Sequence, residues 1–135
     1  MLYPVLIFDL DQTLADEGVV YAGMTEVLQQ LVEQGYRLFV CSFNPYAEWF
    51  TNRQCIREYF EQVVVNLDQE KGETITQLLL DKGINIADVL FFDDDRNNVA
   101  EARMYGIRTY HVPNGGLTPA QVWEQLVNAE GVDGE

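Results

Sequence analysis

In the stretch Ile7-Phe8-Asp9-Leu10-Asp11-Gln12-Thr13-Leu14, an apolar strand ends at two carboxylates and a turn. Side chains two residues apart share one face of a strand, so Asp9 and Asp11 are expected to point the same way. Two carboxylates this close repel each other unless a shared proton or a cation compensates their charge. Hard divalent metals prefer oxygen ligands. The stretch therefore predicts a divalent metal at the end of the first strand.

A second acidic cluster, Asp93-Asp94-Asp95, also follows directly after an apolar segment, Val89-Leu90-Phe91-Phe92. In α/β sheets, ligands bind beyond the carboxyl ends of the strands, near the point where the strand order switches. The two acidic strand ends are therefore expected to converge on one ion. The hydroxyl of Ser42, at the end of another apolar run, is expected at the same edge.

Strand and helix patterns alternate along the whole chain, which predicts right-handed crossovers and a parallel sheet with helices on both faces. The fold class is thus a three-layer α/β/α sandwich with a Rossmann-like sheet of about five strands. A small flap is expected after the first strand, in 15–23, and no cap domain. We expect one domain over 1–135, with a loose tail at 130–135. The expected strands are 5–9, 36–42, 63–65, 89–92 and 107–112; the expected helices are 26–34 with Thr25 as N-cap, 45–60 with a bend, 71–82, 96–105 and one from Thr118-Pro119 onward.

The composition excludes several classes of function. The net charge is −14 and no basic patch is visible, so binding to nucleic acid or an anionic membrane is not expected. The chain shows no secretory signal and no apolar run of about 20 residues, which favours the cytoplasm. Cys41 and Cys55 lack metal-ligand spacing and are interpreted as reduced packing residues.

Four features in order resemble the motifs of the haloacid dehalogenase superfamily. The run 9–14 resembles its DxDxT motif, and Ser42 resembles its hydroxyl motif. Lys71 resembles its motif lysine, and 91–95 resembles its acidic motif. The resemblance covers residues 5 to about 112 and is strongest to small magnesium-dependent phosphatases. It implies a phosphoric monoester hydrolase with Mg²⁺ as cofactor.

The resemblance implies a role for each carboxylate. Asp9 would be the nucleophile that forms an aspartyl-phosphate, and both it and the backbone carbonyl of Asp11 would help hold the metal. Asp11 would protonate the leaving oxygen and later deprotonate water, and its burial near Asp9 is expected to favour the protonated form. Asp94 would bind the metal directly, and Asp93 directly or through water. Asp95 is interpreted as a helix cap or outer residue.

The remaining candidates bind phosphate or balance its charge. We favour Lys71 over Lys82 as the cation, because Lys82 lies in the last turn of its helix, where the helix dipole alone favours a cation. Ser42, Phe43, Asn44 and Thr13 are candidate phosphate-binding residues beside Lys71. Asn98 is either a brace for the acidic loop or a solvated helix residue, and a hydrogen-bonded rim position is favoured for His111 over catalysis.

Several functional alternatives stay open. A catalytically silent phosphate- or protein-binding module on the same scaffold is the main one; a phosphomutase or dehalogenase is less favoured. Without a cap the site is expected to be open to a phosphorylated small molecule or a phosphoprotein. Phe43-Asn44 departs from the basic residue expected after Ser42, and Phe43, Tyr46 and Trp49 are assigned to core packing over an aromatic rim. The sequence indicates neither one substrate nor an oligomeric state.

Overall fold

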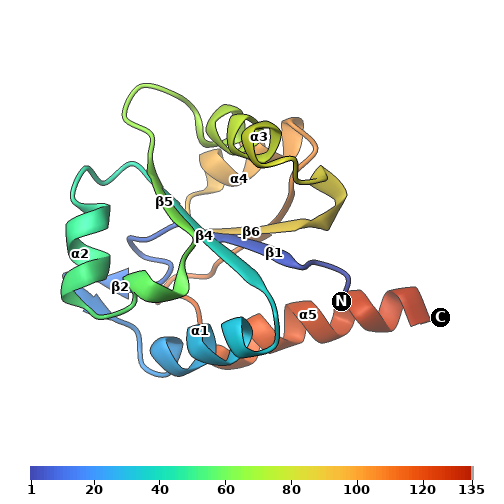
Figure 1. Ribbon diagram of the computed structural model, residues 1–135, viewed down its shortest axis with the longest axis horizontal. Helices are drawn as coiled ribbons and strands as arrows, with labels where there is room; N and C mark the ends of the chain where they lie inside the picture. The colour runs from blue at the N-terminus through green and yellow to red at the C-terminus, as the bar shows by residue number, and fades with distance from the viewer. Residues whose placement is uncertain (135) are drawn as a thin grey trace.

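A five-stranded parallel sheet forms the centre of the computed structural model, which describes the backbone of residues 1–134 and the side chains of residues 1–127 (Figure 1). The strand order is β5-β4-β1-β6-β7, so the chain builds one half of the sheet outward from β1 and then crosses over to build the other half. All four strand pairings in this sheet are parallel. The strands are β1 (Val5–Phe8), β4 (Arg37–Ser42), β5 (Gln62–Val65), β6 (Val89–Asp93) and β7 (Arg108–His111).

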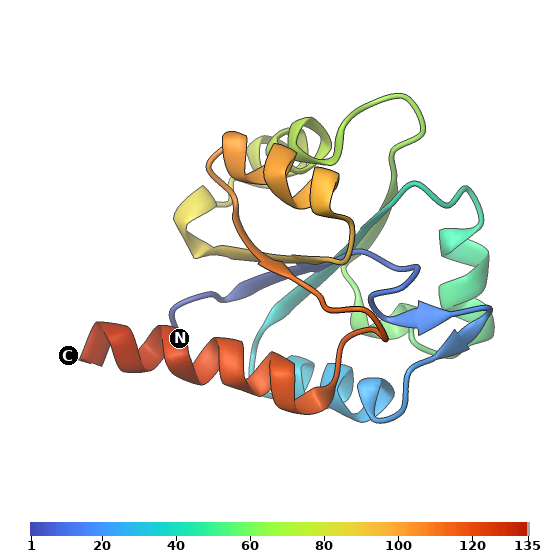
Figure 2. The same ribbon diagram turned by 180° about the vertical axis from the view of Figure 1, so that it is seen from behind.

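Helices cover both faces of this sheet, which confirms the predicted three-layer sandwich. In Figures 1 and 2, α1 and α5 lie on one side of the sheet, and α3 and α4 lie on the other. The remaining helix, α2, lies at the end of the sheet near the small hairpin. The helices are α1 (Met24–Glu33), α2 (Ala47–Arg53), α3 (Lys71–Lys82), α4 (Arg96–Met104) and α5 (Pro119–Gly134), with 3₁₀ turns η1 (Arg57–Tyr59) and η2 (Ile86–Asp88).

Alternation along β1 sends its side chains into two separate apolar cores. Leu6 and Phe8 pack in the core under α1 and α5, whereas Val5 and Ile7 pack in the core under α3. The ring of Phe8 stacks on that of Phe92 at a centroid distance of 4.8 Å. Phe8 and Phe92 are also partners in the strand register, so this stack holds the carboxyl ends of β1 and β6 side by side.

The flap expected after the first strand is a short antiparallel hairpin of β2 (Ala15–Asp16) and β3 (Val19–Val20). Glu17 and Gly18 form its turn with positive φ angles of 48° and 81°. In the part of the chain that the structure describes, this hairpin is the only element of regular structure between β1 and α1. No helix in that part is long and apolar enough to cross a membrane.

Local features at three places differ from the sequence predictions. Thr25 is not an N-cap, because α1 already begins at Met24, after Gly23 with φ 81°. Cys55 lies beyond the end of α2 and is exposed, so it does not pack in a core as Cys41 does. The helix α5 extends to Gly134, into the segment for which we predicted a loose tail, and residue 135 lies outside the described residues.

Candidate active site

The carboxyl ends of three neighbouring strands bring the predicted site residues to one edge of the sheet. Asp9 directly follows β1, Ser42 ends β4 and Asp93 ends β6. The backbone N–H of Asp9 donates to the carbonyl of Phe92 at 2.9 Å, so the sheet hydrogen bonding extends to the first acidic residue. Strand pairing therefore places Asp9 beside Asp93, although 84 residues separate them in the sequence.

Lys71 lies between these two carboxylates and is almost completely buried. Its Nζ donates to Asp9 Oδ1 at 2.5 Å and to Asp93 Oδ2 at 2.9 Å. Lys71 is the first residue of α3, and the backbone N–H of Gly72 donates to the carboxylate of Glu101 on α4 at 2.7 Å. Packing between α3 and α4 thus holds the ammonium at the strand ends. Lys82, the rival candidate, lies exposed at the far end of the same helix.

Burial shifts the protonation of this cluster. Removal from water raises the pKa of Asp9 to about 8, although the charge of Lys71 acts in the opposite direction. Burial also raises the pKa of Asp93. Burial alone would lower the pKa of Lys71, but the charges of Asp9 and Asp93 outweigh it and raise that pKa. One ammonium thus compensates one of two buried carboxylates, and the second favours a proton or a further cation.

Three carboxylates of the cluster have the donor set of a hard divalent cation. Asp9, Asp93 and Asp94 each offer an oxygen, and these oxygens all lie within 4.8 Å of one another. Thr13 Oγ1 lies 3.2 Å from Asp9 Oδ2 and 3.4 Å from Asp94 Oδ1, so its hydroxyl can donate to either carboxylate. Three buried or half-buried carboxylates with a single lysine suit Mg²⁺ or Ca²⁺.

Asp93 and Asp94, at the end of β6 and in the loop after it, have different surroundings. Asp93 is fully buried and accepts hydrogen bonds from the backbone N–H of Asp95 at 2.8 Å and from Asn98 Nδ2 at 3.3 Å. Asp95 caps α4 by accepting from the N–H groups of residues 97 and 98, as the sequence predicted. Asp94 is half-buried, and its backbone carbonyl lies 3.0 Å from His111 Nε2. His111 is therefore a hydrogen-bonded rim residue, and Asn98 braces the loop.

The prediction that Asp11 is buried beside Asp9 is wrong. Its side chain is exposed, and its Oδ2 accepts a hydrogen bond from Asn44 Nδ2 at 3.1 Å. The strand β1 ends at Phe8, and residues 9–11 lie beyond it, before a turn over 12–14 in which Gln12 has a φ of 65°, so the alternation rule for strands does not apply. The carboxylate of Asp11 is also not a member of the metal-binding group.

The structure nonetheless places Asp11 in the same hollow as most of the other candidates, which we call the acidic cleft. The acidic cleft has a volume of about 170 Å³. Its walls come from the segments that follow β1 and β6, from the end of β4 and the loop after it, and from the starts of α3 and α4, whereas Asp93 itself does not line it. Its lining residues are Asp9, Asp11, Ser42, Phe43, Asn44, Lys71, Asp94, Asp95 and Asn98.

The loop after β4 forms the wall of the acidic cleft opposite the acidic loop. Ser42 Oγ accepts from the backbone N–H of Asn44 at 3.0 Å, and Asn44 Oδ1 accepts from the backbone N–H of Tyr46 at 2.8 Å. These two side-chain turns hold the loop in a fixed shape. The ring of Phe43 lies over Lys71, with Nζ 5.1 Å from its centroid. Phe43 thus takes the place of the basic residue expected there.

The assignment of the loop aromatics to the core is wrong. Phe43 is 43% exposed, Tyr46 69% and Trp49 62%. On α2, Ala47 and Thr51 take the buried positions and the half-buried Phe50 packs against the core, whereas Glu48 and Trp49 between them are exposed. Apolar residues occur on both faces of this short helix, so its sequence pattern does not indicate which face is buried. A role for Glu101 in holding the start of α3 was likewise not predicted.

The acid phosphatase family model matches this chain over residues 15–130. This range contains Ser42, Lys71, Asp93 and Asp94 but starts after Asp9 and Asp11. A search of curated proteins found no match.

Solved structures agree with the fold at low sequence identity. A haloacid dehalogenase-like hydrolase from Streptococcus pneumoniae has a TM-score of 0.78 at 12% identity, over 92% of this chain and 98% of that one. The N-terminal part of a Bacteroides fragilis protein, which contains a phosphatase domain and is in complex with Mg, has a TM-score of 0.67 at 19% identity, over 95% of this chain and 40% of that one. A haloacid dehalogenase family enzyme from Bacteroides thetaiotaomicron, in complex with magnesium and inorganic phosphate, has a TM-score of 0.68 at 14% identity, over 84% of this chain and 96% of that one.

Proposed function

The chain belongs to the acid phosphatase family within the haloacid dehalogenase superfamily, and we propose that it hydrolyses phosphomonoesters with Mg²⁺ through an aspartyl-phosphate on Asp9. The family makes it a phosphatase; the mechanism is our proposal. The observation that carries it is the buried ammonium of Lys71 between Asp9 and Asp93, beside the half-buried Asp94. An anionic nucleophile can approach an anionic phosphate only where positive charge is held in place, and this arrangement holds it.

The first step transfers the phosphoryl group to the protein. A carboxylate oxygen of Asp9 attacks phosphorus, and the bond between phosphorus and the leaving oxygen breaks. Asp11 donates its proton to that leaving oxygen, so that a neutral alcohol departs. The exposed position of Asp11 at the mouth of the acidic cleft suits this role, because the leaving group must be able to diffuse away.

The second step returns the protein to its starting state. Asp11, now ionised, takes a proton from a water molecule that attacks the same phosphorus atom. The bond between phosphorus and Asp9 breaks, which releases inorganic phosphate and restores both carboxyl groups. The hydrogen bond from Asn44 to Asp11 orients the carboxylate for both proton transfers.

The surrounding residues hold charge and phosphate. The carboxylates of Asp9, Asp93 and Asp94 and the backbone carbonyl of Asp11 would hold Mg²⁺, which supplies positive charge to screen the phosphate from the nucleophile. Lys71 balances charge on the transferring group. The hydroxyl of Ser42 and the backbone N–H of residue 43 are the proposed phosphate contacts, and Phe43 and Asn44 shape that wall of the acidic cleft. Thr13, predicted to bind phosphate, is buried outside the lining of the cleft, and its hydroxyl instead contacts Asp9 and Asp94.

The proposed substrate is a phosphorylated small molecule or a phosphoprotein. Between β1 and α1 the described residues form no regular structure other than the hairpin β2–β3, which favours an open site. We propose that residues 1–135 act as one domain, and a cytoplasmic location stays a prediction from the sequence.

The proposal is tested with p-nitrophenyl phosphate, the wild type and the variant Asp9→Asn. We expect phosphate release that depends on Mg²⁺ in the wild type, loss of that release in Asp9→Asn at unchanged circular dichroism, and full activity in Asp81→Asn, whose exposed carboxylate lies on α3. Acid-quenched wild type incubated with labelled substrate should carry label that hydroxylamine removes, as an acyl phosphate does. Full activity in Asp9→Asn would refute the mechanism. Binding of Mg²⁺ and a phosphate mimic without any turnover would instead favour the binding-module alternative.

A further inference from the structure

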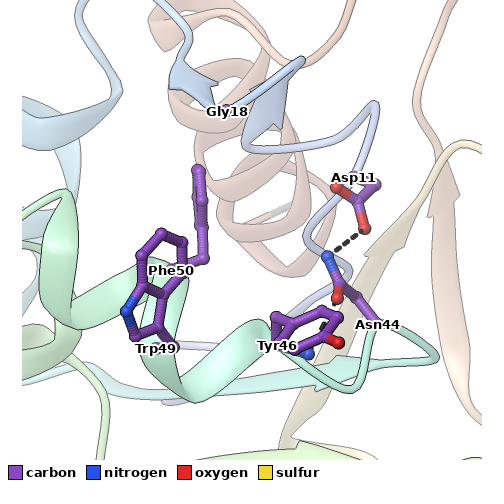
Figure 3. A pocket seen from close by; sticks show the side chains of 6 residues that line it. All are labelled: Asp11, Gly18, Asn44, Tyr46, Trp49 and Phe50. Atoms are coloured by element: carbon purple, nitrogen blue, oxygen red, sulfur yellow. Dashed lines mark hydrogen bonds between the residues drawn. The ribbon is translucent and has the colours of Figure 1, made fainter.

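A second hollow adjoins the acidic cleft, and we call it the aromatic pocket. Its volume is about 470 Å³, within the range of pockets that bind small organic ligands. Figure 3 shows Trp49, Phe50 and Tyr46 rising from α2 and the residue before it, with the flap turn at Gly18 across from them. The aromatic pocket is lined by Asp11, Gly18, Asn44, Tyr46, Trp49 and Phe50.

The aromatic side chains of this pocket leave large apolar surfaces in contact with water. Tyr46, the residue before α2, is 69% exposed, and Trp49 on α2 is 62% exposed; both line the aromatic pocket. Burial of such a ring gains about 25 cal/mol for each Å² removed from water. A flat apolar group that enters the aromatic pocket would gain this energy.

The acidic cleft and the aromatic pocket share a wall. Asp11 and Asn44 line both hollows, and the hydrogen bond of 3.1 Å between them forms the boundary. Asn44 Oδ1 also accepts a hydrogen bond from the backbone N–H of Tyr46, which links this boundary to the first aromatic residue of the aromatic pocket. Whatever binds in the aromatic pocket therefore lies directly next to the carboxyl group of Asp11.

The position of Asp11 in both hollows indicates which part of a substrate binds in the aromatic pocket. In the proposed mechanism Asp11 protonates the leaving oxygen, so this oxygen lies against Asp11 and the rest of the leaving group extends from it, away from phosphorus and alongside Asp11. We propose that the aromatic pocket binds the leaving group, and that the preferred substrates are small phosphomonoesters whose alcohol carries an uncharged aromatic ring. This inference rests on the proposed function, because it uses the role of Asp11. The carboxylate at the boundary and the net charge of −14 oppose an anionic leaving group.

Benzyl phosphate and ethyl phosphate form a matched pair of substrates, since both release a primary alcohol and differ in the ring. The wild type is expected to show a kcat/KM for benzyl phosphate at least about tenfold higher than for ethyl phosphate. The reason is that the ring gains free energy from its buried apolar area and from contact with the aromatic side chains. In Trp49→Ala, and separately in Tyr46→Ala, this ratio is expected to fall about three- to tenfold. The control Tyr105→Ala removes an exposed aromatic ring at the end of α4 and should leave the ratio unchanged.

Two results overturn the inference: a ratio near one in the wild type, or a ratio that neither Trp49→Ala nor Tyr46→Ala lowers. A binding measurement separates this outcome from failure of the proposed function. Calorimetry of the Asp9→Asn variant should show tighter binding of benzyl than of ethyl phosphate, and the added substitution Trp49→Ala should remove that preference. Turnover without a benzyl preference refutes only the aromatic pocket, whereas the absence of turnover with any phosphomonoester refutes the proposed function.

Discussion

Removal of the charge of Asp9 should stabilise the protein in the absence of metal, and more so as the pH rises. Burial raises the pKa of Asp9 from 3.8 to about 8, so the folded state binds a proton more tightly than the unfolded state. Stability falls with rising pH wherever the folded state binds more protons. The wild type therefore loses stability from about pH 4 to pH 8 through this group. In Asp9→Asn that loss is absent, while the amide still fills the space between Lys71 and Thr13.

The magnitude follows from the change in proton affinity. At about 1.4 kcal/mol for each pKa unit, the difference between 3.8 and about 8 sets an upper limit of about 6 kcal/mol. Relaxation of the site and entry of water reduce such penalties in real proteins. We expect the stability of Asp9→Asn relative to the wild type to increase by about 2–4 kcal/mol between pH 5 and pH 8.

Urea unfolding of both proteins in EDTA, at several pH values from 5 to 8, measures this difference. Asp81→Asn is the control, because it makes the same substitution at an exposed carboxylate outside the buried cluster. Mg²⁺ at pH 8 should then stabilise the wild type more than Asp9→Asn, since binding to the folded state alone adds stability. A stability difference between Asp9→Asn and wild type that stays constant from pH 5 to pH 8 would refute the reasoning about burial.

Three further substitutions test other parts of the structure. Lys71→Met leaves two buried carboxylates without their cation, so it should cost about 3 kcal/mol of stability at pH 8 and nearly all activity, measured by urea unfolding and turnover assays. The control Lys82→Met, at the exposed end of the same helix, should change neither quantity. Asp95→Ala removes the N-cap of α4 and should cost about 1 kcal/mol in thermal unfolding; Asp95→Asn keeps a cap, so an equal loss in both variants would contradict the capping role. Phe8→Ala deletes a fully buried ring stacked on Phe92 and should cost about 3–5 kcal/mol in urea; a loss below about 1 kcal/mol would show that the two strand ends do not depend on this stack.

Most of the fold could be predicted because each element carries its own periodic pattern. The apolar runs in 5–9, 36–42 and 89–92 are too short and too continuous for amphipathic helices, and β1, β4 and β6 lie there. The helix α3 was predicted at 71–82 with Gly83 after it, and the structure has those bounds. Such patterns are local, because they depend on side chains a few residues apart. The start of α1 was missed since Gly23 takes a left-handed conformation beside Pro119, a contact from the other end of the chain.

The sequence by itself determined which residues could do chemistry: two acidic clusters after apolar strands, a hydroxyl after another and a lysine at the start of a helix. Only the tertiary structure decided how they are arranged. It put the ammonium of Lys71 between Asp9 and Asp93, left Asp11 exposed at a hydrogen bond to Asn44, and turned Tyr46 and Trp49 outward into a pocket. The physical reason is that burial and charge pairing depend on contacts between residues 22 to 62 positions apart, which strand order and helix packing create and local patterns do not record.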